Sequence, residues 1–341
     1  MSSNMETKKK NGGGRGILSV IGGDKLVLMA AIVAVFILFT IINANYFTWT
    51  NIVNILVAAS MTGTIAVGHT YLIIAAQNDL SPGSLLATCG VTMATLLSFN
   101  VPLILAVLIT VGVGVLAGIF NAWMVNSIKL EAFIATLVSQ MVFRGIAYII
   151  CDGRPVAISN QAMIDFGKMR FLTIPMAVWI MVIAMVVFGF ILAKTRFGRS
   201  VYAIGGSMEA ARLAGLNPKR IITICFILIG VLSAVAGIAY AARMNAGQPT
   251  AGVNLEFDAI TAVILGGVSF TGGVGSMGGT ALGVFLIQAF NSGLSMIGMS
   301  TFWQYIARGA LLLFALTTDY IRKERKNKAL LEASMKAAMN S

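Results

Sequence analysis

The residues best able to do chemistry in this chain are polar side chains inside or beside long apolar stretches. Placing a polar group in hydrocarbon is costly, so each one marks a candidate contact for a solute. They are rich in amides and poor in acids, and amides match the hydroxyls of neutral polyhydroxyl solutes. For each residue alone, a hydrogen bond between helices is the competing interpretation. The candidates for a substrate path are Gln77, Asn78, Asp79, Gln140, Arg144, Asn291 and Gln304.

The sequence offers no set of residues for hydrolytic, redox or metal chemistry. Its one histidine, His69, has no nucleophile positioned beside it for a catalytic triad and cannot make a metal site alone. We interpret His69 as a buried core residue that is hydrogen-bonded. The isolated cysteines Cys89, Cys151 and Cys225 are expected to be small packing residues. We therefore expect no catalytic residue, no metal and no cofactor.

A glycine-rich run at 266–279 resembles a phosphate cradle at first sight. It lacks the Gly-Lys-Ser/Thr ending whose lysine contacts phosphates, and it lies in an apolar context. We interpret the run as a broken or tightly packed helix. The chain is therefore expected to have no ATPase of its own and not to be an enzyme.

Composition indicates a membrane protein, with lipid as its surroundings. Apolar residues make up 58% of the 341 residues and charged residues 11%, against about 25% charged in soluble domains. The net charge of +12 comes from cations in tails and loops that flank apolar stretches. The tendency of positive loops to stay in the cytoplasm explains that charge, so no nucleic-acid partner is expected.

The elements that must position these residues are predicted to be membrane-spanning helices, because about 20 apolar residues cross the hydrocarbon. The fold class is an all-α polytopic membrane protein with about ten transmembrane helices. A break at Gln77–Ser81 after the second span is tolerated only beside protein or a water-filled cavity. The predicted spans are 26–43, 52–76, 84–99, 102–126, 132–151, 174–194, 221–242, 257–270, 279–298 and 302–320.

The charges divide the chain into a 1–25 N-terminal tail, a 26–320 transmembrane domain and a 321–341 C-terminal tail. An even number of spans puts both termini on one side, and basic residues put that side in the cytoplasm. FNAW at 120–123 and FNSG at 290–293 each end a predicted span. This short match indicates an inverted repeat, which is common in transporters.

The polar loop at 195–220 carries a predicted short helix over 208–214. Ser207 suits its N-cap, Glu209 suits the positive end of the helix dipole, and Gly215 suits its C-terminal stop. Such a short helix is unstable alone in water and needs a surface to pack on. From these residues, that surface is equally well an external ATP-hydrolysing motor or the chain's own bundle.

Several motifs along the chain resemble the permease subunits of bacterial ATP-binding cassette (ABC) importers for monosaccharides, the ribose/galactose type. These subunits belong to the branched-chain amino-acid permease superfamily, and the resemblance runs from Asn51 to Asp319. The motifs are AVGHTYLIIAAQNDLSPGS (66–84), EAFIATLV (131–138), RG (144–145), GRPV (153–156), TRFGRSVYAIGGSMEAARLAGLN (195–217), AGQPTAG (246–252), FDAITAVILGGVSFTGGVGSMGGT (257–280) and NSGLSMIGMSTFWQYIARGALLLFAL (291–316).

The resemblance implies an ATP-driven importer for a monosaccharide or related polyol in the bacterial cytoplasmic membrane. It implies three partners: an ATP-binding cassette protein, an extracytoplasmic sugar-binding protein and a second permease subunit. By similarity, the 199–217 stretch couples to the ATPase. The coupling residues are then Arg199, Ser207, Glu209, Ala210, Arg212, Leu213 and Gly215.

One departure leaves the identity of the sugar open. Related permeases often read GGIDLS or QGTDLS where this chain has AAQNDLSPG, so Asp79-Leu80-Ser81 is kept while Asn78 and Pro82 differ. Ribose, galactose, xylose, another pentose or hexose, a polyol and a furanose-type signal molecule all fit the pattern.

Two other functions remain as alternatives. A branched-chain amino-acid ABC permease needs a contact for the ammonium group, and an ion-coupled secondary carrier more often has paired acids at mid-span. The sequence shows neither feature. Its acids there all fall near the ends of predicted spans: Glu131, Glu256, Asp258 and Asp319.

Overall fold

The structure is a computed structural model that describes residues 23–339. Its apolar runs form helices, because in a membrane only a helix satisfies every backbone group within one segment. The helices that match the predicted spans are α2 (Gly23–Ile42), α3 (Trp49–Ile74), α4 (Pro82–Ser98), α5 (Leu103–Trp123), α6 (Ala132–Ile150), α8 (Met176–Lys194), α11 (Pro218–Met244), α12 (Leu255–Leu265), α13 (Met277–Met296) and α14 (Thr301–Met339).

Within residues 23–339, five helical stretches are long and apolar enough to cross a membrane. The chain is therefore a helical, multi-pass membrane protein, as the sequence predicts. The stretches are Trp49–Ile74, Leu103–Ile128, Ala132–Ile150, Met176–Lys194 and Pro218–Met244.

Short elements connect these helices. A 3-10 helix, η1 (Ala44–Phe47), joins α2 to α3, and a π-helical turn, η2 (Met124–Ile128), extends α5. The other short helices are α7 (Gln161–Lys168), α9 (Arg196–Gly206) and α10 (Met208–Leu213). Two antiparallel strand pairs join β1 (Val156–Ala157) to β4 (Ala246–Gly247) and β2 (Arg170–Phe171) to β3 (Ile174–Pro175).

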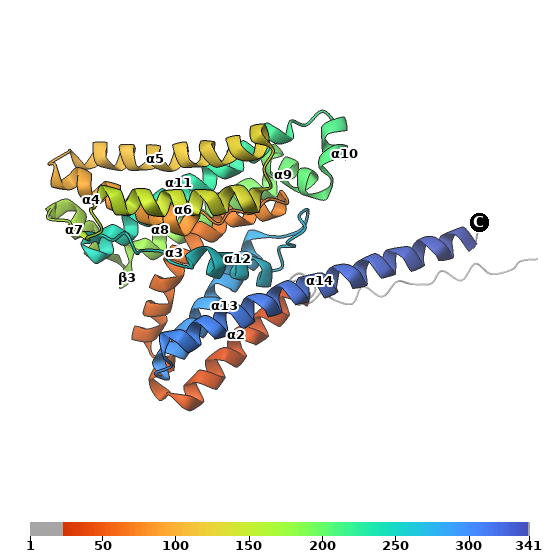
Figure 1. The fold of residues 1–341 in the computed structure, drawn as a ribbon. Coiled ribbons are helices and arrows are strands. Elements are labelled where there is room, and N and C mark those ends of the chain that lie inside the picture. Colours follow the sequence, from red (N-terminus) through yellow and green to blue (C-terminus); the bar gives the residue numbers. More distant parts are fainter. Residues whose placement is uncertain (1–22, 340–341) are drawn as a thin grey trace, which may run out of the picture.

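The helices form two groups that share α3. Figure 1 shows α4, α5, α6 and α11 running side by side, while α2, α13 and the start of α14 run together at an angle to them. Helix α11 packs on α5, α4 and α3, and α13 packs on α12, α3 and α2. Helices α9 and α10 lie at one end of the first group, and α7 lies at the other end.

Small residues allow the closest of these contacts, because they let helix backbones approach one another. A Cβ on Gly114 would lie 2.5 Å from the carbonyl oxygen of Gly230, so α5 and α11 meet backbone to backbone. Gly279 and Gly283 similarly face the backbone of Gly266 and Ala262, which joins α13 to the end of α12.

Helix α12 is shorter than the predicted span, and helices α2 and α14 are longer. Helix α12 ends at Leu265 rather than 270, because the glycine run begins there and Gly267 has a φ of +86°. Helix α14 continues to Met339, so most of the expected 321–341 tail is helical. The expected 1–25 tail lies outside the described residues up to residue 22, and α2 already begins at Gly23.

Candidate functional site

The predicted break after the second span is present between α3 and α4. Helix α3 ends at Ile74 and α4 begins at Pro82. Asp79 lies in this break and is 1% exposed. Its Oδ1 accepts hydrogen bonds from the backbone N–H of Ser81 at 2.8 Å and from the Ser81 hydroxyl at 2.7 Å. The carboxylate therefore takes the place of the missing helical carbonyls at the start of α4.

Two neighbouring helices complete what we call the α4–α6 cluster: Asp79, Ser81, Asn121 and Ser139. The amide nitrogen of Asn121 on α5 donates to the Ser81 hydroxyl at 2.9 Å and lies 3.4 Å from Asp79 Oδ2. Ser139 on α6 donates to the Asn121 Oδ1 at 2.5 Å. All four side chains are almost fully buried. The cluster thus ties three helices together through side chains that are bonded to one another.

A second polar group joins α6 to the loop before α12. Gln140 Nε2 donates to Glu256 Oε1 at 2.7 Å, and Arg144 donates to the carbonyls of Pro249 and Ala251 at 2.6 and 2.7 Å. Glu256 is 1% exposed, and its Oε2 has no hydrogen-bond partner among the described residues. Of these two predicted path residues, Arg144 thus holds the loop before α12, and Gln140 holds the first turn of α12.

A third group, the α12–α14 cluster, consists of Asp258, Asn291 and Arg308. Asn291 on α13 donates to Asp258 Oδ2 at 3.2 Å, and Arg308 on α14 pairs with the same oxygen at 3.4 Å. Asp258 and Asn291 are buried, while the side chain of Arg308 is 31% exposed. This cluster is partly open to its surroundings.

The structure separates the remaining predicted path residues from these clusters. Gln77 lines a cavity of about 820 Å³ beside α10, together with Lys129 and Arg212. Gln304 donates to the carbonyl of Met299 at 2.9 Å and so helps to close the α13–α14 turn. Asn78 lies in the break, and its Oδ1 is buried with no partner among residues 23–339.

His69 is buried, as expected, but the expected hydrogen bond is wrong. It is 1% exposed, and neither ring nitrogen has a partner within the described part of the chain. Helix α3 is buried along most of its length, so His69 faces packed helices. The three cysteines are buried, as predicted.

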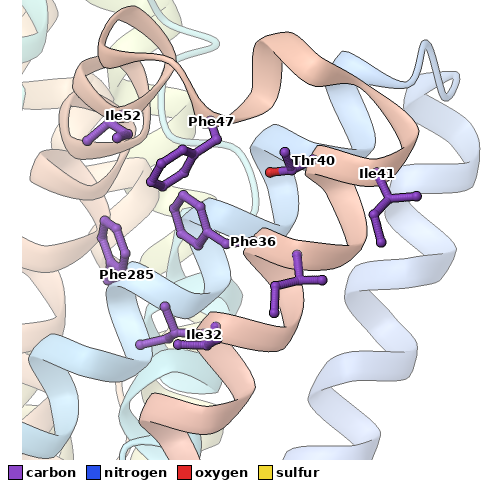
Figure 2. A pocket seen from close by; sticks show the side chains of 9 residues that line it. Ile32, Phe36, Thr40, Ile41, Phe47, Ile52 and Phe285 are labelled. Carbon is purple, nitrogen blue, oxygen red and sulfur yellow. The ribbon is translucent and has the colours of Figure 1, made fainter.

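An apolar cavity of about 620 Å³ lies between α2, the start of α3 and α13. Figure 2 shows Phe36, Phe47 and Phe285 facing one another across it, with Ile32 and Ile52 at its sides. Thr40 is the polar residue of its lining. This lining suits hydrocarbon, because it cannot orient a polyhydroxyl solute.

The predicted coupling segment forms two consecutive short helices rather than one. Helix α9 was not predicted; the Thr195 hydroxyl caps it by accepting from Gly198 N at 3.2 Å. Helix α10 begins as expected, since Ser207 accepts from Ala210 N at 3.2 Å, and Gly215 follows its end with a φ of +82°. Leu213 is 90% exposed, which is unusual for a large apolar side chain. The seven predicted coupling residues are all exposed: Arg199, Ser207, Glu209, Ala210, Arg212, Leu213 and Gly215.

The inner face of this segment rests on the end of α3 and on the glycine run. A Cβ on Gly205 would clash with the carbonyl oxygen of Ile74, and Gly273 N donates to that same oxygen at 2.8 Å. The Tyr202 hydroxyl donates to the carbonyl of Gly275 at 2.8 Å. Burial raises the pKa of Tyr202, which keeps this hydroxyl protonated as a donor.

Sequence reasoning missed the acids of α12. Glu256 and Asp258 stand at the start of a helix, as expected for a span end, yet they are only 1% and 8% exposed. A signal was available in the sequence. The two acids stand at the start of the shortest predicted span, which is too short to cross the membrane and so leaves them inside it. Ser139 was also missed, and a lone serine in a span carries no such signal.

Among the described residues, no group of three or more His, Cys, Asp or Glu side chains could hold a metal ion. No solved structure was found to match the chain. The sequence does match curated proteins over most of its length. It is 38% identical to the ribose import permease of Haemophilus influenzae, covering 86% of this chain and 90% of that protein.

Two further relatives are similar. The ribose import permease of Escherichia coli K12 is 37% identical, over 86% of this chain and 94% of its own length. The L-arabinose ABC transporter permease of Azospirillum brasilense is 36% identical, over 89% of this chain and 90% of its own. The model of the family described as "Branched-chain amino acid transport system / permease component" matches residues 51–316. The chain therefore belongs to this family of transport-system permeases.

Proposed function

We propose that this chain is the translocating subunit of an ATP-driven importer for a monosaccharide in a bacterial cytoplasmic membrane. The observation that carries the proposal is the coupling segment of α9 and α10: its outer face is exposed while its inner face is locked onto α3 and the glycine run. An external motor can grip the outer face, and the inner face passes its movement into the bundle.

The contacts suggest how a push on α10 reaches the solute path. Gly205 and Gly273 both meet the carbonyl of Ile74, the last residue of α3. The break that holds Asp79 begins directly after that helix. A shift of α9 therefore moves the hinge between α3 and α4, where the backbone is not held by continuous helical hydrogen bonds. We propose that this movement alternates access between the two sides.

Two features support an inverted repeat of helices. Asp79 precedes the short helix α4 and contacts Asn121 on the next helix; Asp258 lies in the first turn of the short helix α12 and contacts Asn291 on the next helix. These asparagines are those of the two FN motifs. A repeat of opposite orientation, with ten helices in all, puts both termini in the cytoplasm with the basic coupling segment.

A monosaccharide is the favoured solute because the similar permeases are named for ribose and L-arabinose. The amide and carboxylate groups of the buried clusters are suited to hydroxyls. An amino-acid substrate, which the family's description also allows, would need an acid for its ammonium group. Asp258 is already neutralised by the cation of Arg308, and Glu256 is only 1% exposed and so is closed to a solute.

We further propose that ATP hydrolysis occurs on a partner ATP-binding cassette protein, that an extracytoplasmic binding protein delivers the sugar, and that a second permease subunit completes the path. The exposed Leu213 supports the first of these contacts, because an isolated apolar side chain on a short polar helix gains free energy only on a partner.

Cross-linking tests the docking directly. Cys89, Cys151 and Cys225 are buried, so Leu213→Cys adds one exposed thiol for a heterobifunctional cross-linker. We expect it to capture an ATP-binding cassette protein in native membranes. Leu172→Cys is the matched control, because Leu172 is also exposed but lies near α7 at the other end of the bundle. Equal capture by both variants, or by neither, would contradict the docking.

Disrupting α10 should uncouple transport without preventing membrane insertion. Glu209→Lys removes the negative charge at the positive end of α10 and adds a like charge to a basic segment. We expect at least about a tenfold loss of uptake, equal to about 1.4 kcal/mol of coupling. Deletion of 208–216 should abolish uptake. Normal uptake by the well-inserted deletion variant would refute the coupling role.

A further inference from the structure

A small cavity between α12 and α14 combines charged, polar and aromatic side chains. Its volume is about 270 Å³, and its lining includes Phe257, Asp258, Thr261, Tyr305 and Arg308. Pockets for drug-sized ligands measure about 300–1,000 Å³. This cavity is therefore suited to a smaller molecule.

The ionisable groups indicate that the cavity faces water or protein rather than lipid. The Arg308 side chain is 31% exposed and its partner Asp258 is 11% exposed. Arg308 lies seven residues into α14, about 10 Å along the helix at 1.5 Å per residue. Ionisable residues at such depth face a bundle interior or a water-filled cavity, because exposure to hydrocarbon is too costly.

The polar groups of the cavity retain hydrogen-bonding capacity. Arg308 Nε is buried and has no partner among the described residues. Asn291 and Arg308 both contact Oδ2 of Asp258, which leaves its second oxygen as an acceptor. Thr261 donates its hydroxyl proton to the carbonyl of Phe257, so its oxygen can still accept. Donors and acceptors thus converge on one space.

The aromatic groups supply a different contact. Phe257 is 38% exposed and Tyr305 is 48% exposed, although both line the cavity. The C–H groups on one face of a sugar ring pack on an aromatic face, while the ring hydroxyls bond to polar groups at its edge. Half-exposed aromatic rings beside an ion pair match both kinds of surface on a monosaccharide.

We propose that this cavity is a transient binding site for a monosaccharide on its way through the permease, an inference that rests on the proposed sugar-import function. Asp258 and Arg308 bond the hydroxyls, and Phe257 and Tyr305 hold the apolar face. Binding is weak, because a transport site must release what it takes up.

Filling the cavity tests the site. Gly309 lines it, and a Cβ there would meet no atom within 4 Å, so Gly309→Leu occupies the space without a backbone clash. Gly112→Leu is the matched control, since Gly112 on α5 is equally open and lies outside the cavity. Both are compared with wild type for ATP-driven uptake of radiolabelled D-ribose, L-arabinose, D-xylose and D-galactose in proteoliposomes that also contain the proposed partner ATPase and binding protein.

We expect Gly309→Leu to lower uptake at least about tenfold, or about 1.4 kcal/mol, while the control transports normally and the partner ATPase hydrolyses ATP with either variant. A second variant, Phe257→Leu with Tyr305→Leu, should also weaken transport, by raising the sugar concentration needed for half-maximal uptake. Wild-type uptake by Gly309→Leu would overturn the site while the import function stands. A wild-type protein that carries none of the four sugars would instead overturn the proposed function and the site with it.

Discussion

The α4–α6 cluster and the α12–α14 cluster each contain an aspartate and an asparagine, but they differ in how far their side chains are buried. Each has an aspartate beside the start of a short helix and an asparagine on the next helix. In the first, Ser139 supplies a neutral hydroxyl from the third helix and every side chain is buried. In the second, Arg308 supplies a charge and remains partly exposed.

The difference separates a structural role from a ligand-binding one. A buried network of side chains that bond to one another fixes the positions of its helices, and its loss leaves several buried polar groups without hydrogen-bond partners. An ion pair at the edge of a cavity contributes little to stability but can exchange its partners for a solute. We therefore expect mutations in the first cluster to act on folding, and mutations in the second to act on transport.

The largest stability effect should come from Asp79→Ala. It removes the acceptor of both Ser81 bonds and leaves buried donors unpaired, at about 1–3 kcal/mol for each stranded group. Thermal unfolding of the purified protein in detergent measures the loss. Asp165→Ala, at an exposed site on α7, serves as control and should change stability by less than about 0.5 kcal/mol. Equal melting temperatures for both variants would contradict a structural role for Asp79.

A smaller effect should distinguish the two asparagines. Asn121→Leu breaks bonds to Asp79, Ser81 and Ser139, whereas Asn291→Leu breaks one to Asp258. At about 1 kcal/mol for each hydrogen bond, the first variant should lose roughly 3 kcal/mol and the second roughly 1 kcal/mol. Urea or heat titrations of the pair, run side by side, give this difference. A larger loss for Asn291→Leu would reverse the comparison.

The smallest stability effect is expected for Arg308→Gln. The pair it breaks is long, at 3.4 Å, and partly exposed, so the cost should be within about 1 kcal/mol. Uptake should nevertheless fall, because the cavity loses its cation. Melting temperature and sugar uptake measured on one preparation check both expectations. A strongly destabilised variant would mean that this cluster, too, is structural.

The sequence predicted the helices well because a membrane span carries a strong signal: a run of apolar residues of fixed minimum length. It missed α9 because that helix is short and amphipathic, and its stability comes from packing on Ile74 and Gly275. It extended α12 too far, since Val268 and Phe270 continue the apolar pattern after the glycines have ended the helix.

The site was less predictable, because polar residues far apart in the sequence meet only in the fold. Asp79 and the break beside it were visible from the residues that follow the second span. Its partner Asn121 is 42 residues away by sequence number, and Ser139, which bonds to Asn121, is 60 residues away; no local pattern links them. Gln77 and Gln304 were indistinguishable from the others in sequence, and each lies apart from the clusters.

The most direct test of the account is whether transport needs ATP on the side of α10. Proteoliposomes that contain this chain, the proposed partner ATPase and the binding protein are assayed for uptake of D-ribose and L-arabinose. We predict uptake only with binding protein outside and ATP at the α10 face, and none with the 208–216 deletion. Uptake without ATP, driven by an ion gradient in liposomes that contain this chain alone, would contradict the account and indicate a secondary carrier.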